Sequence, residues 1–196
     1  MDAFNVSAGA EGVDYDKLIK LFGCSKITPD LIEKIEALSG MQAHRFLRRG
    51  IFFSHRDLHT ILEKFEKGQP FYLYTGRGPS SESLHLGHTI PFIFTKYLQE
   101  AFDVPLVIQI TDDEKFIHNP KLQLDQTIKM GISNIKDIIA FGFDPERTFI
   151  FSDTEYIQFL YQNVLKVQKN VTLNQIKGIF GVDGGSNSGK IAFPAV

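Results

Sequence analysis

The stretch that decides the fold is Phe71–His88, which reads FYLYTGRGPSSESLHLGH. It opens with a short apolar and aromatic run that is typical of a strand. A turn containing Gly76 and Gly78 follows, and the chain then enters an apolar helix. A helix that starts directly after a strand and a glycine turn presents backbone N–H groups and a positive dipole end. The stretch therefore predicts an α/β fold with a phosphate site at this turn.

The chain after this stretch alternates between strand and helix patterns. Apolar runs predict strands over 105–110 and 148–151, and periodic apolar residues predict helices over 89–102, 122–141 and 155–167. About 35 residues separate equivalent points of the first two strands, which fits a βαβ crossover. Residues 71–196 are therefore expected to form the first part of a Rossmann-like, doubly wound parallel sheet. Ligands bind such sheets at the carboxyl ends of the strands, near a point where the strand order reverses.

Residues 1–70 are expected to form a separate helical extension. Residues 1–13 are aperiodic and rich in small residues, so a mobile start is expected. Helices are predicted over 14–22, after the Thr28-Pro29 start signal, and after a capping box over 54–57. Beyond the third strand, a helix is favoured over 171–180. A loop and a further strand at 191–193 are expected to follow.

Composition limits the classes of function. The 196 residues carry a formal net charge of −2, so a nucleic-acid partner would have to be bound locally rather than by general basicity. Cys24 is the single cysteine, which excludes an internal disulfide and suits a reducing compartment. No leader pattern opens the chain, and the apolar runs are too short to cross a bilayer, so no membrane association is expected.

The turn carries the candidate site residues. Gly76 and Gly78 remove side chains where a ligand can approach the backbone, and Arg77 offers a fork of donors for a phosphate or carboxylate. His85 and His88 flank Gly87 near the helix start, where imidazoles can donate to phosphate oxygens. The alternative is a plain strand–turn–helix corner with polar surface histidines. The surrounding βαβ pattern favours the functional interpretation.

Several longer strings make the resemblance specific. His85-Leu86-Gly87-His88 resembles the HIGH signature of class I aminoacyl-tRNA synthetases. Within that family, the chain most closely resembles the eukaryotic cytoplasmic tryptophanyl type. The segments that carry this resemblance are 72–81, 46–57, 105–115 and 148–153. The resemblance runs from about Asp14 to the end of the chain. It covers only the front part of the family's catalytic domain.

The resemblance implies a reaction and residue roles. ATP with Mg²⁺ would activate tryptophan, and the adenylate would acylate tRNA(Trp), in a cytoplasmic homodimer. His85 and His88 would stabilise the transition state, and Gly87 would pack against adenosine. Residues 76–78 would line the nucleotide side. Tyr74 and Gln109 would end neighbouring strands and accept from the indole N–H, while Glu114 would pair with the α-ammonium. Without the resemblance, another interpretation would be equally good. Tyr74 and Gln109 would be ordinary strand-end residues, and Glu114 would belong to a solvated helix start.

Two motifs and a metal site are rejected on the sequence. Gly184–Lys190 fits a P-loop spacing, but Ile191 stands where Ser or Thr is required, and the next segment has a strand pattern. Lys129–Ser133 superficially resembles the family's KMSKS loop, but it lies within an amphipathic helix pattern. His85 and His88 have a metal-ligand spacing, but no third ligand stands at a convincing offset, so no metal site is expected.

The match to the family's pattern is incomplete. No KMSKS loop, second half of the sheet or anticodon-binding domain is recognisable, so the 196 residues alone are not expected to charge tRNA. Two other functions stay open. One is another HIGH-type adenylate former, either a tyrosyl-tRNA synthetase or a nucleotidylyltransferase. The other is a non-catalytic fragment that binds tryptophan or ATP with a regulatory role.

Overall fold

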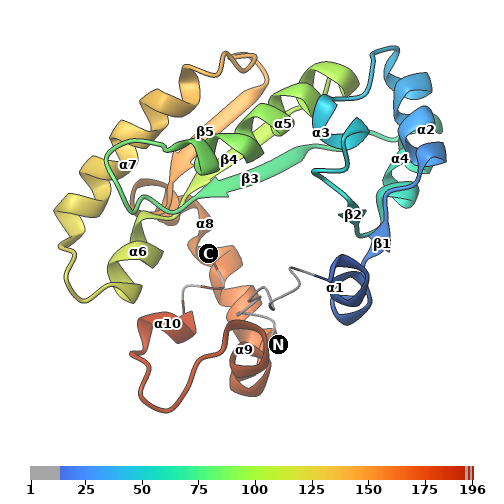
Figure 1. The fold of residues 1–196 in the computed structure, drawn as a ribbon. Helices are drawn as coiled ribbons and strands as arrows, with labels where there is room; N and C mark the ends of the chain where they lie inside the picture. Colours follow the sequence, from blue (N-terminus) through green and yellow to red (C-terminus); the bar gives the residue numbers. More distant parts are fainter. Residues whose placement is uncertain (1–13, 193, 195) are drawn as a thin grey trace. The chain divides into compact units, whose positions relative to one another are not determined.

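The chain divides into two compact units. The computed structural model describes residues 14–192, 194 and 196. One unit comprises residues 1–72 with 97–104, and the other comprises 73–96 with 105–196. The mobile start that the sequence predicts over 1–13 lies outside the described residues. The candidate site residues all belong to the second unit. Figure 1 labels the helices and strands along the chain.

The first unit is mainly helical. Its elements are α1 (Tyr15–Leu21), α2 (Pro29–Ser39), α3 (Arg45–Arg48), α4 (Leu58–Glu66), and two short antiparallel strands, β1 (Ser25–Lys26) and β2 (Ser54–His55). The Asp14 side chain caps α1 by accepting from the Lys17 N–H at 3.0 Å. Pro29 opens α2, and Gly40 ends it in the left-handed conformation, with φ of 66°. These boundaries confirm the start and stop signals in the sequence.

The predicted capping box before α4 is wrong. Ser54 and His55 pair with β1, so they belong to a strand rather than to a helix start. Asp57 is the N-cap residue, with a left-handed φ of 54° and no side-chain cap bond. The His55 Nδ1 atom instead accepts from the Leu58 N–H at 3.2 Å. The strand pairing places His55 next to the start of α4. Its imidazole therefore accepts the backbone N–H at the helix start, which was the role expected of Ser54.

Apolar residues from separate helices form the core of the first unit. Four of them are nearly inaccessible to solvent: Ile35, Ala43, Leu47 and Leu62. Phe65 packs edge-on against Phe71 and Phe102, with ring centroids 5.6 and 5.1 Å apart. Edge-to-face pairs of this kind stabilise a core beyond the area that they bury. The unit therefore holds together through its own apolar contacts.

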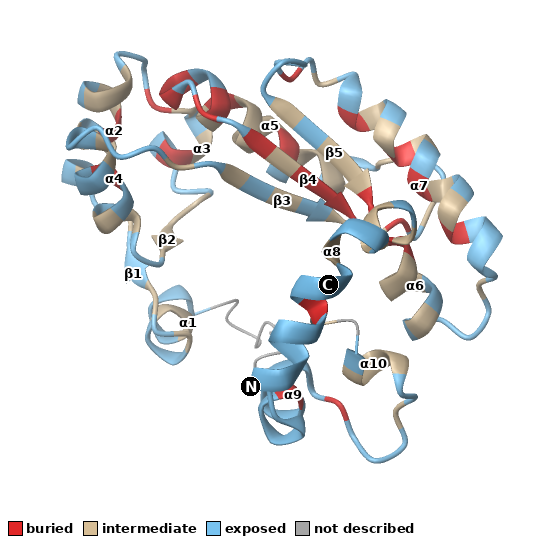
Figure 2. Ribbon diagram, turned by 180° about the vertical axis from the view of Figure 1, so that it is seen from behind, coloured by how far each residue is buried: buried red, intermediate tan, exposed pale blue. Residues whose placement is uncertain are grey.

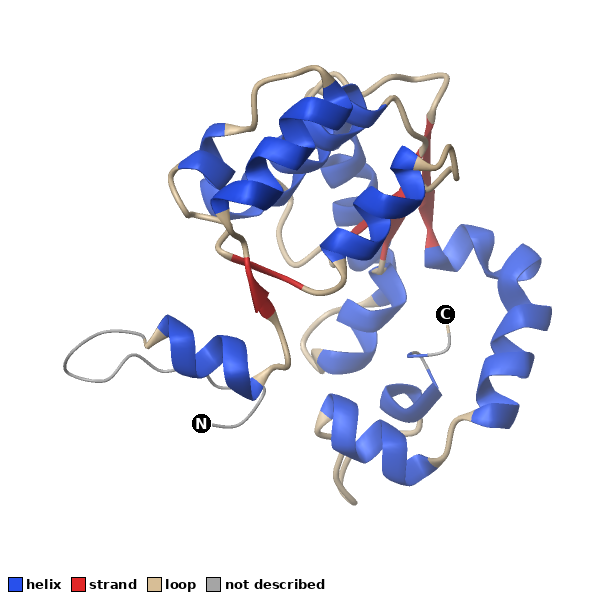
Figure 3. Cartoon of the chain, turned by 90° about the vertical axis from the view of Figure 1, so that its right-hand side faces the viewer, coloured by secondary structure: helices blue, strands red, loops and turns tan. Residues whose placement is uncertain are grey.

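The second unit is built on a parallel sheet. Its strands are β3 (Leu73–Arg77), β4 (Leu106–Ile110) and β5 (Thr148–Ser152), hydrogen-bonded in the order β3-β4-β5 (Figure 1). Figure 3 draws the strands in red and the helices in blue. The crossovers contain α5 (Leu86–Phe102) and the pair α6 (Asp112–His118) and α7 (Leu124–Ile139). The Rossmann-like parallel sheet is confirmed. These three strands run in sequential order, so the described residues supply one half of a doubly wound sheet.

Side chains on the two faces of the sheet have different surroundings. Leu106, Ile108 and Ile110 point to one face and form a buried core with Phe92 of α5 and Ile138 of α7. Figure 2 colours most of β4 as buried. The alternation of a strand places Gln109 and, from the parallel register, Gly76 and Phe151 on the opposite face. Tyr74 shares that face, and its side chain is mainly exposed. The second face is therefore the one with polar and aromatic groups available to a ligand.

Two helices differ from the sequence prediction in ways that matter for the site. Helix α5 begins at Leu86, three residues before the predicted start, so Pro91 lies in the second turn rather than the first. Pro91 has no N–H to give to the Gly87 carbonyl. The predicted helix over 122–141 is α7, which is shorter, and Ile132 and Ile139 face solvent rather than the core.

The last part of the chain is helical. Helices α8 (Asp153–Asn170) and α9 (Leu173–Phe180) confirm the helices predicted there. The strand expected at 191–193 is wrong, because Gly189–Ala192 form the short helix α10, and Phe193 lies outside the described residues. Its turn is closed by the Ala192 N–H, which donates to the Ser188 carbonyl at 3.2 Å. Residues 184–190 still do not form a P-loop, because they follow helix α9 rather than a strand.

No helix in the described part of the chain is long and apolar enough to span a membrane.

Candidate functional site

The first group of site residues, which we call the amide cluster, comprises Tyr74, Gln109 and Asp153. Tyr74 is the second residue of β3 and not its last, contrary to the sequence prediction, whereas Gln109 is the penultimate residue of β4. Gly76 pairs with Gln109 in the register, so Tyr74 stands diagonally to Gln109 on the same face. The Tyr74 hydroxyl donates to Gln109 Oε1. Tyrosine is long enough to make this diagonal contact, and a side chain at Gly76 would come within 3.8 Å of the Tyr74 hydroxyl.

The amide nitrogen of Gln109 is hydrogen-bonded by the first residue of α8. Its Nε2 donates to Asp153 Oδ1 at 2.7 Å. Asp153 is the first residue of α8 and is only 2% exposed. Burial raises the pKa of the Asp153 carboxyl to about 8, with the Asp113 and Asp112 carboxyls adding to the effect. Gln109 therefore has both ends of its amide bonded, and sequence analysis missed Asp153, the residue that bonds one of them.

Glu114 lies in the first turn of α6 with both oxygens engaged. The Thr111 hydroxyl donates to Glu114 Oε2 at 2.8 Å, and Lys115 Nζ lies 3.1 Å from Oε1. The same lysine covers the glycine turn, since a Cβ at Gly78 would lie 2.1 Å from Lys115 Cε. A cationic ligand group that reached Glu114 would have to compete with Lys115. The sequence contained this lysine beside Glu114 but gave no sign that it lies over Gly78.

The second group, which we call the histidine cluster, comprises Arg77, His85 and His88. The rings of His85 and His88 stack with centroids 3.4 Å apart. His85 Nδ1 accepts from the Gly87 N–H at 3.1 Å, and the His85 carbonyl accepts from the His88 N–H at 2.8 Å. The sequence predicted free N–H groups at this helix start. The structure shows that His85 itself uses two of them.

Arg77 points to the sheet face opposite Tyr74, so the two clusters lie on different faces of β3. Its Nε donates to Asn134 Oδ1 at 2.9 Å. Arg77 Nη2 and His88 Nδ1 are buried polar atoms with no hydrogen-bond partner among the described residues. Burial lowers the pKa of the His88 imidazole, and the nearby Arg77 and His85 lower it further. Buried polar atoms without partners are uncommon and mark a place where a ligand can bind.

Two polar residues of α7 position the segment that leads to the histidines. Asn134 is fully buried, and its Nδ2 donates to the carbonyls of Ser81 at 2.8 Å and Glu82 at 3.1 Å. Asp137 accepts from the Leu84 N–H at 2.9 Å. Sequence analysis missed both residues. A polar residue on the buried face of an amphipathic helix was the signal that could have found Asn134.

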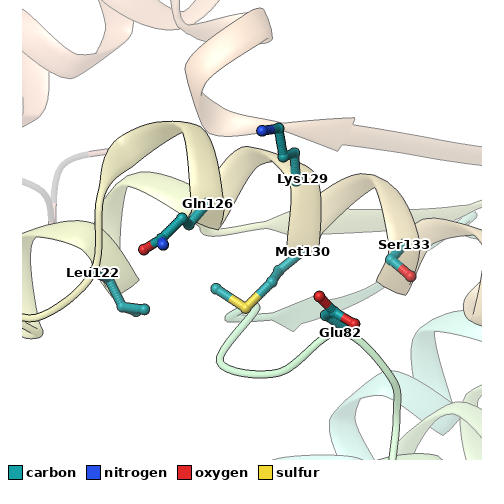
Figure 4. Close-up of a pocket in the computed structure, with 6 residues that line it drawn as sticks. All are labelled: Glu82, Leu122, Gln126, Lys129, Met130 and Ser133. Atoms are coloured by element: carbon teal, nitrogen blue, oxygen red, sulfur yellow. The ribbon is translucent and has the colours of Figure 1, made fainter.

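The KMSKS-like residues Lys129–Ser133 lie within α7, as the sequence predicted. Gly131 allows this helix to pack closely on the sheet, because a Cβ there would lie 3.2 Å from Ile110 Cγ2. A pocket of about 450 Å³ lies beside the helix, lined by Glu82, Leu122, Gln126, Lys129, Met130 and Ser133 (Figure 4). None of the predicted site residues lines it. This glycine is therefore explained by helix packing rather than by a catalytic loop.

His85 and His88 have the spacing of metal ligands in the sequence. Within the part of the chain that the structure describes, no group of three or more His, Cys, Asp or Glu side chains could hold a metal ion. His85 Nδ1 is already bonded to the backbone. The arrangement can instead offer donors to an anion at the histidine cluster and an acceptor to an N–H group at the amide cluster.

Comparisons with known proteins agree on one family. The model of the class I tRNA synthetases (W and Y) matches residues 66–191. The cytoplasmic tryptophan–tRNA ligase of Rattus norvegicus is 59% identical over 193 residues, which is 97% of this chain and 40% of the relative. The chain therefore spans less than half the length of that relative.

Solved structures show the same similarity. Plasmodium falciparum tryptophanyl-tRNA synthetase matches with a TM-score of 0.89 and 55% identity, over 93% of this chain and 51% of that one. The tryptophan-bound enzyme of Encephalitozoon cuniculi matches with a TM-score of 0.89 and 50% identity, over 93% and 53%. Both the sequence match over 66–191 and the parallel sheet with its histidine-bearing turn lead to the same result: the chain belongs to the class I tRNA synthetases of the W and Y family.

Proposed function

We propose that this chain is part of an enzyme that activates tryptophan with ATP and transfers it to tRNA(Trp). The observation that carries the proposal is the Tyr74–Gln109 pair, which places an acceptor on the sheet face opposite the apolar core. Relatives that are more than half identical in sequence are named tryptophan–tRNA ligases. One of the similar structures is described as bound to tryptophan.

The amide cluster suits an indole ring. An indole has one donor, its ring N–H, and Gln109 Oε1 and the Tyr74 hydroxyl oxygen are the acceptors that this face offers. Phe151 is the register neighbour of Gln109 on the same face and supplies aromatic surface. Glu114 would then bind the α-ammonium in place of Lys115. A site that requires this hydrogen bond rejects analogues without it by roughly 10⁴–10⁵.

The histidine cluster suits the triphosphate of ATP. Arg77 Nη2 and His88 Nδ1 are buried and lack partners among the residues that the structure describes. His85 keeps its Nε2 edge for a ligand because Nδ1 is bonded. Gly76, Arg77 and Gly78 would line the nucleotide side, and Gly87, which has no side chain, would let adenosine pack on the helix start. Mg²⁺ would be held by the ATP phosphates, since magnesium is usually bound through few protein ligands.

The chemistry is a nucleotidyl transfer followed by an acyl transfer. The tryptophan carboxylate attacks the α-phosphorus of ATP, the bond to the β-phosphate oxygen breaks, and pyrophosphate leaves. A ribose hydroxyl of the tRNA then attacks the carbonyl carbon, and AMP leaves. His85 and His88 stabilise the negative charge that develops on the phosphate oxygens, while Glu114 and Gln109 hold the amino acid in position.

The proposed setting follows from the relatives. Their names place them in the cytoplasm. We propose the same location and a homodimeric enzyme. Because the chain spans 40% of the rat relative, tRNA recognition is proposed for the whole protein and not for these residues.

The test is ATP–pyrophosphate exchange in the full-length protein, with tryptophan or tyrosine as the amino acid. Exchange that depends on tryptophan supports the proposal, and exchange with tyrosine alone overturns it. Gln109→Ala should lower kcat/KM for tryptophan by about 100-fold, because a buried hydrogen bond to the substrate is lost. Gln158→Ala, which changes an exposed glutamine of α8, is the matched control and should not lower it.

A further inference from the structure

The orientation of the Gln109 amide has a structural cause in Asp153. A carboxamide presents an acceptor at one end and donors at the other, and the two ends have nearly the same shape. In this structure Gln109 Nε2 donates to Asp153 Oδ1 at 2.7 Å, and Oε1 accepts from the Tyr74 hydroxyl. Asp153 accepts the Gln109 N–H through Oδ1, and the proton that its carboxyl holds below the raised pKa is shared with the Asp113 carboxyl rather than with Gln109. The carbonyl end of Gln109 is therefore directed away from Asp153 and toward Tyr74.

The Asp153 side chain is itself held in place. It is 2% exposed and lies at the first residue of α8, directly after β5. Its carboxyl is hydrogen-bonded to that of Asp113 in α6, and Asp112 also faces it. Thr154 adds a second link between the two helices, since its N–H and hydroxyl donate to Asp112 at 3.1 and 2.6 Å. The acceptor that Gln109 needs is thus supplied at a hydrogen-bonded contact between α6 and α8.

We propose that Asp153 is a positioning residue that selects for the indole N–H by fixing the polarity of the Gln109 carboxamide. This inference rests on the proposed function. Without Asp153, the Gln109 amide can rotate and present its NH₂ group to the ligand, and two donors would then face each other. Asp153 contacts neither tryptophan nor ATP in this account and acts only through Gln109.

The test compares tryptophan with β-(3-benzothienyl)-L-alanine, in which sulfur replaces the ring N–H. The full-length protein is assayed by ATP–pyrophosphate exchange with each amino acid. In Asp153→Ala, kcat/KM should fall by about 10- to 100-fold for tryptophan and much less for the sulfur analogue. Asp153→Asn keeps an acceptor for Gln109 and a donor for Asp113, and it should restore most of the preference for tryptophan.

Two further variants make the result decisive. Thr154→Val removes the hydroxyl hydrogen bond to Asp112 at the same contact between α6 and α8 and leaves the backbone one in place. It does not touch Gln109, so it should keep the preference for tryptophan. Asp153→Ser, whose hydroxyl is too short to reach Gln109, replaces Asp153→Ala if that variant does not fold. Equal losses for both amino acids, or an unchanged ratio, would overturn the role of Asp153. A wild-type protein that shows no exchange with tryptophan would instead overturn the proposed function.

Discussion

The amide cluster and the histidine cluster differ in how their polar atoms are satisfied. Gln109 is bonded at both ends of its amide, to Tyr74 and to Asp153. Arg77 and His88 each keep one buried polar atom without a partner among the described residues. The first group is organised by the protein alone, whereas the second is completed only when a ligand supplies acceptors. A preorganised amide favours selectivity, and unsatisfied donors favour binding of developing charge.

The largest expected effect is at the histidine cluster. His88→Ala removes a group that is proposed to stabilise charge in the transition state, so kcat for ATP–pyrophosphate exchange should fall about 100- to 1000-fold. KM for tryptophan should change little, because the amide cluster is untouched. His59→Ala, at an exposed histidine of α4, serves as the control. If His88→Ala raised KM for tryptophan and left kcat intact, the division into two clusters would be wrong.

The next largest effect is expected on stability, at the buried asparagine that holds the segment leading to the histidine cluster. Asn134→Ala removes three hydrogen bonds, to Arg77, Ser81 and Glu82, from a fully buried position. The free energy of unfolding should fall by about 2–4 kcal/mol, since buried partners are left unsatisfied. Urea denaturation measures this loss. Asn163→Ala, at an exposed asparagine, should leave stability within about 0.5 kcal/mol of the wild type.

A smaller effect tests the burial of the amide cluster. The pKa of Asp153 is raised to about 8, so between about pH 4 and pH 8 the folded state keeps a proton that the unfolded state releases. Stability should therefore decrease as pH rises through this window, by no more than about 1.4 kcal/mol per pH unit. Denaturation curves at several pH values measure the slope. Asp153→Asn cannot titrate, and a slope as steep as that of the wild type in this variant would contradict the assignment.

The smallest effect on stability is expected at the glycine turn. A Cβ at Gly78 would lie 2.1 Å from Lys115 Cε, but this is the far end of a flexible side chain that can move. Gly78→Ala should cost less than about 1 kcal/mol in unfolding free energy while raising KM for ATP, because Lys115 is displaced toward the nucleotide side. Gly184→Ala adds a Cβ in open space and is the control. An unchanged KM for ATP in Gly78→Ala would show that the turn does not line the nucleotide.

Local signals in the sequence were enough for much of the fold. The apolar run that becomes β4 is nearly continuous because both faces of this strand are largely covered. The cap and stop signals around α2 act within a few residues. The errors arose where a contact distant in sequence prevailed. Pairing with β1 drew Ser54 and His55 into a strand. Residues 191–193 were expected to begin an apolar strand, but Gly189–Ala192 form a helix, and the preceding Asn187 Nδ2 donates to the distant Ile117 carbonyl at 3.0 Å.

For the candidate site too, some features follow from the sequence and others only from the tertiary structure. The sequence by itself determined the residue types and their order, including the two histidines, the glycine turn and Gln109 at a strand end. Only the tertiary structure decided that Arg77 and Tyr74 face opposite sides of β3, that Lys115 covers Gly78, and that Asp153 orients Gln109. Tyr74, Gln109 and Asp153 come from three different strand-to-helix segments. Their contacts depend on strand register and helix packing, which no local pattern encodes.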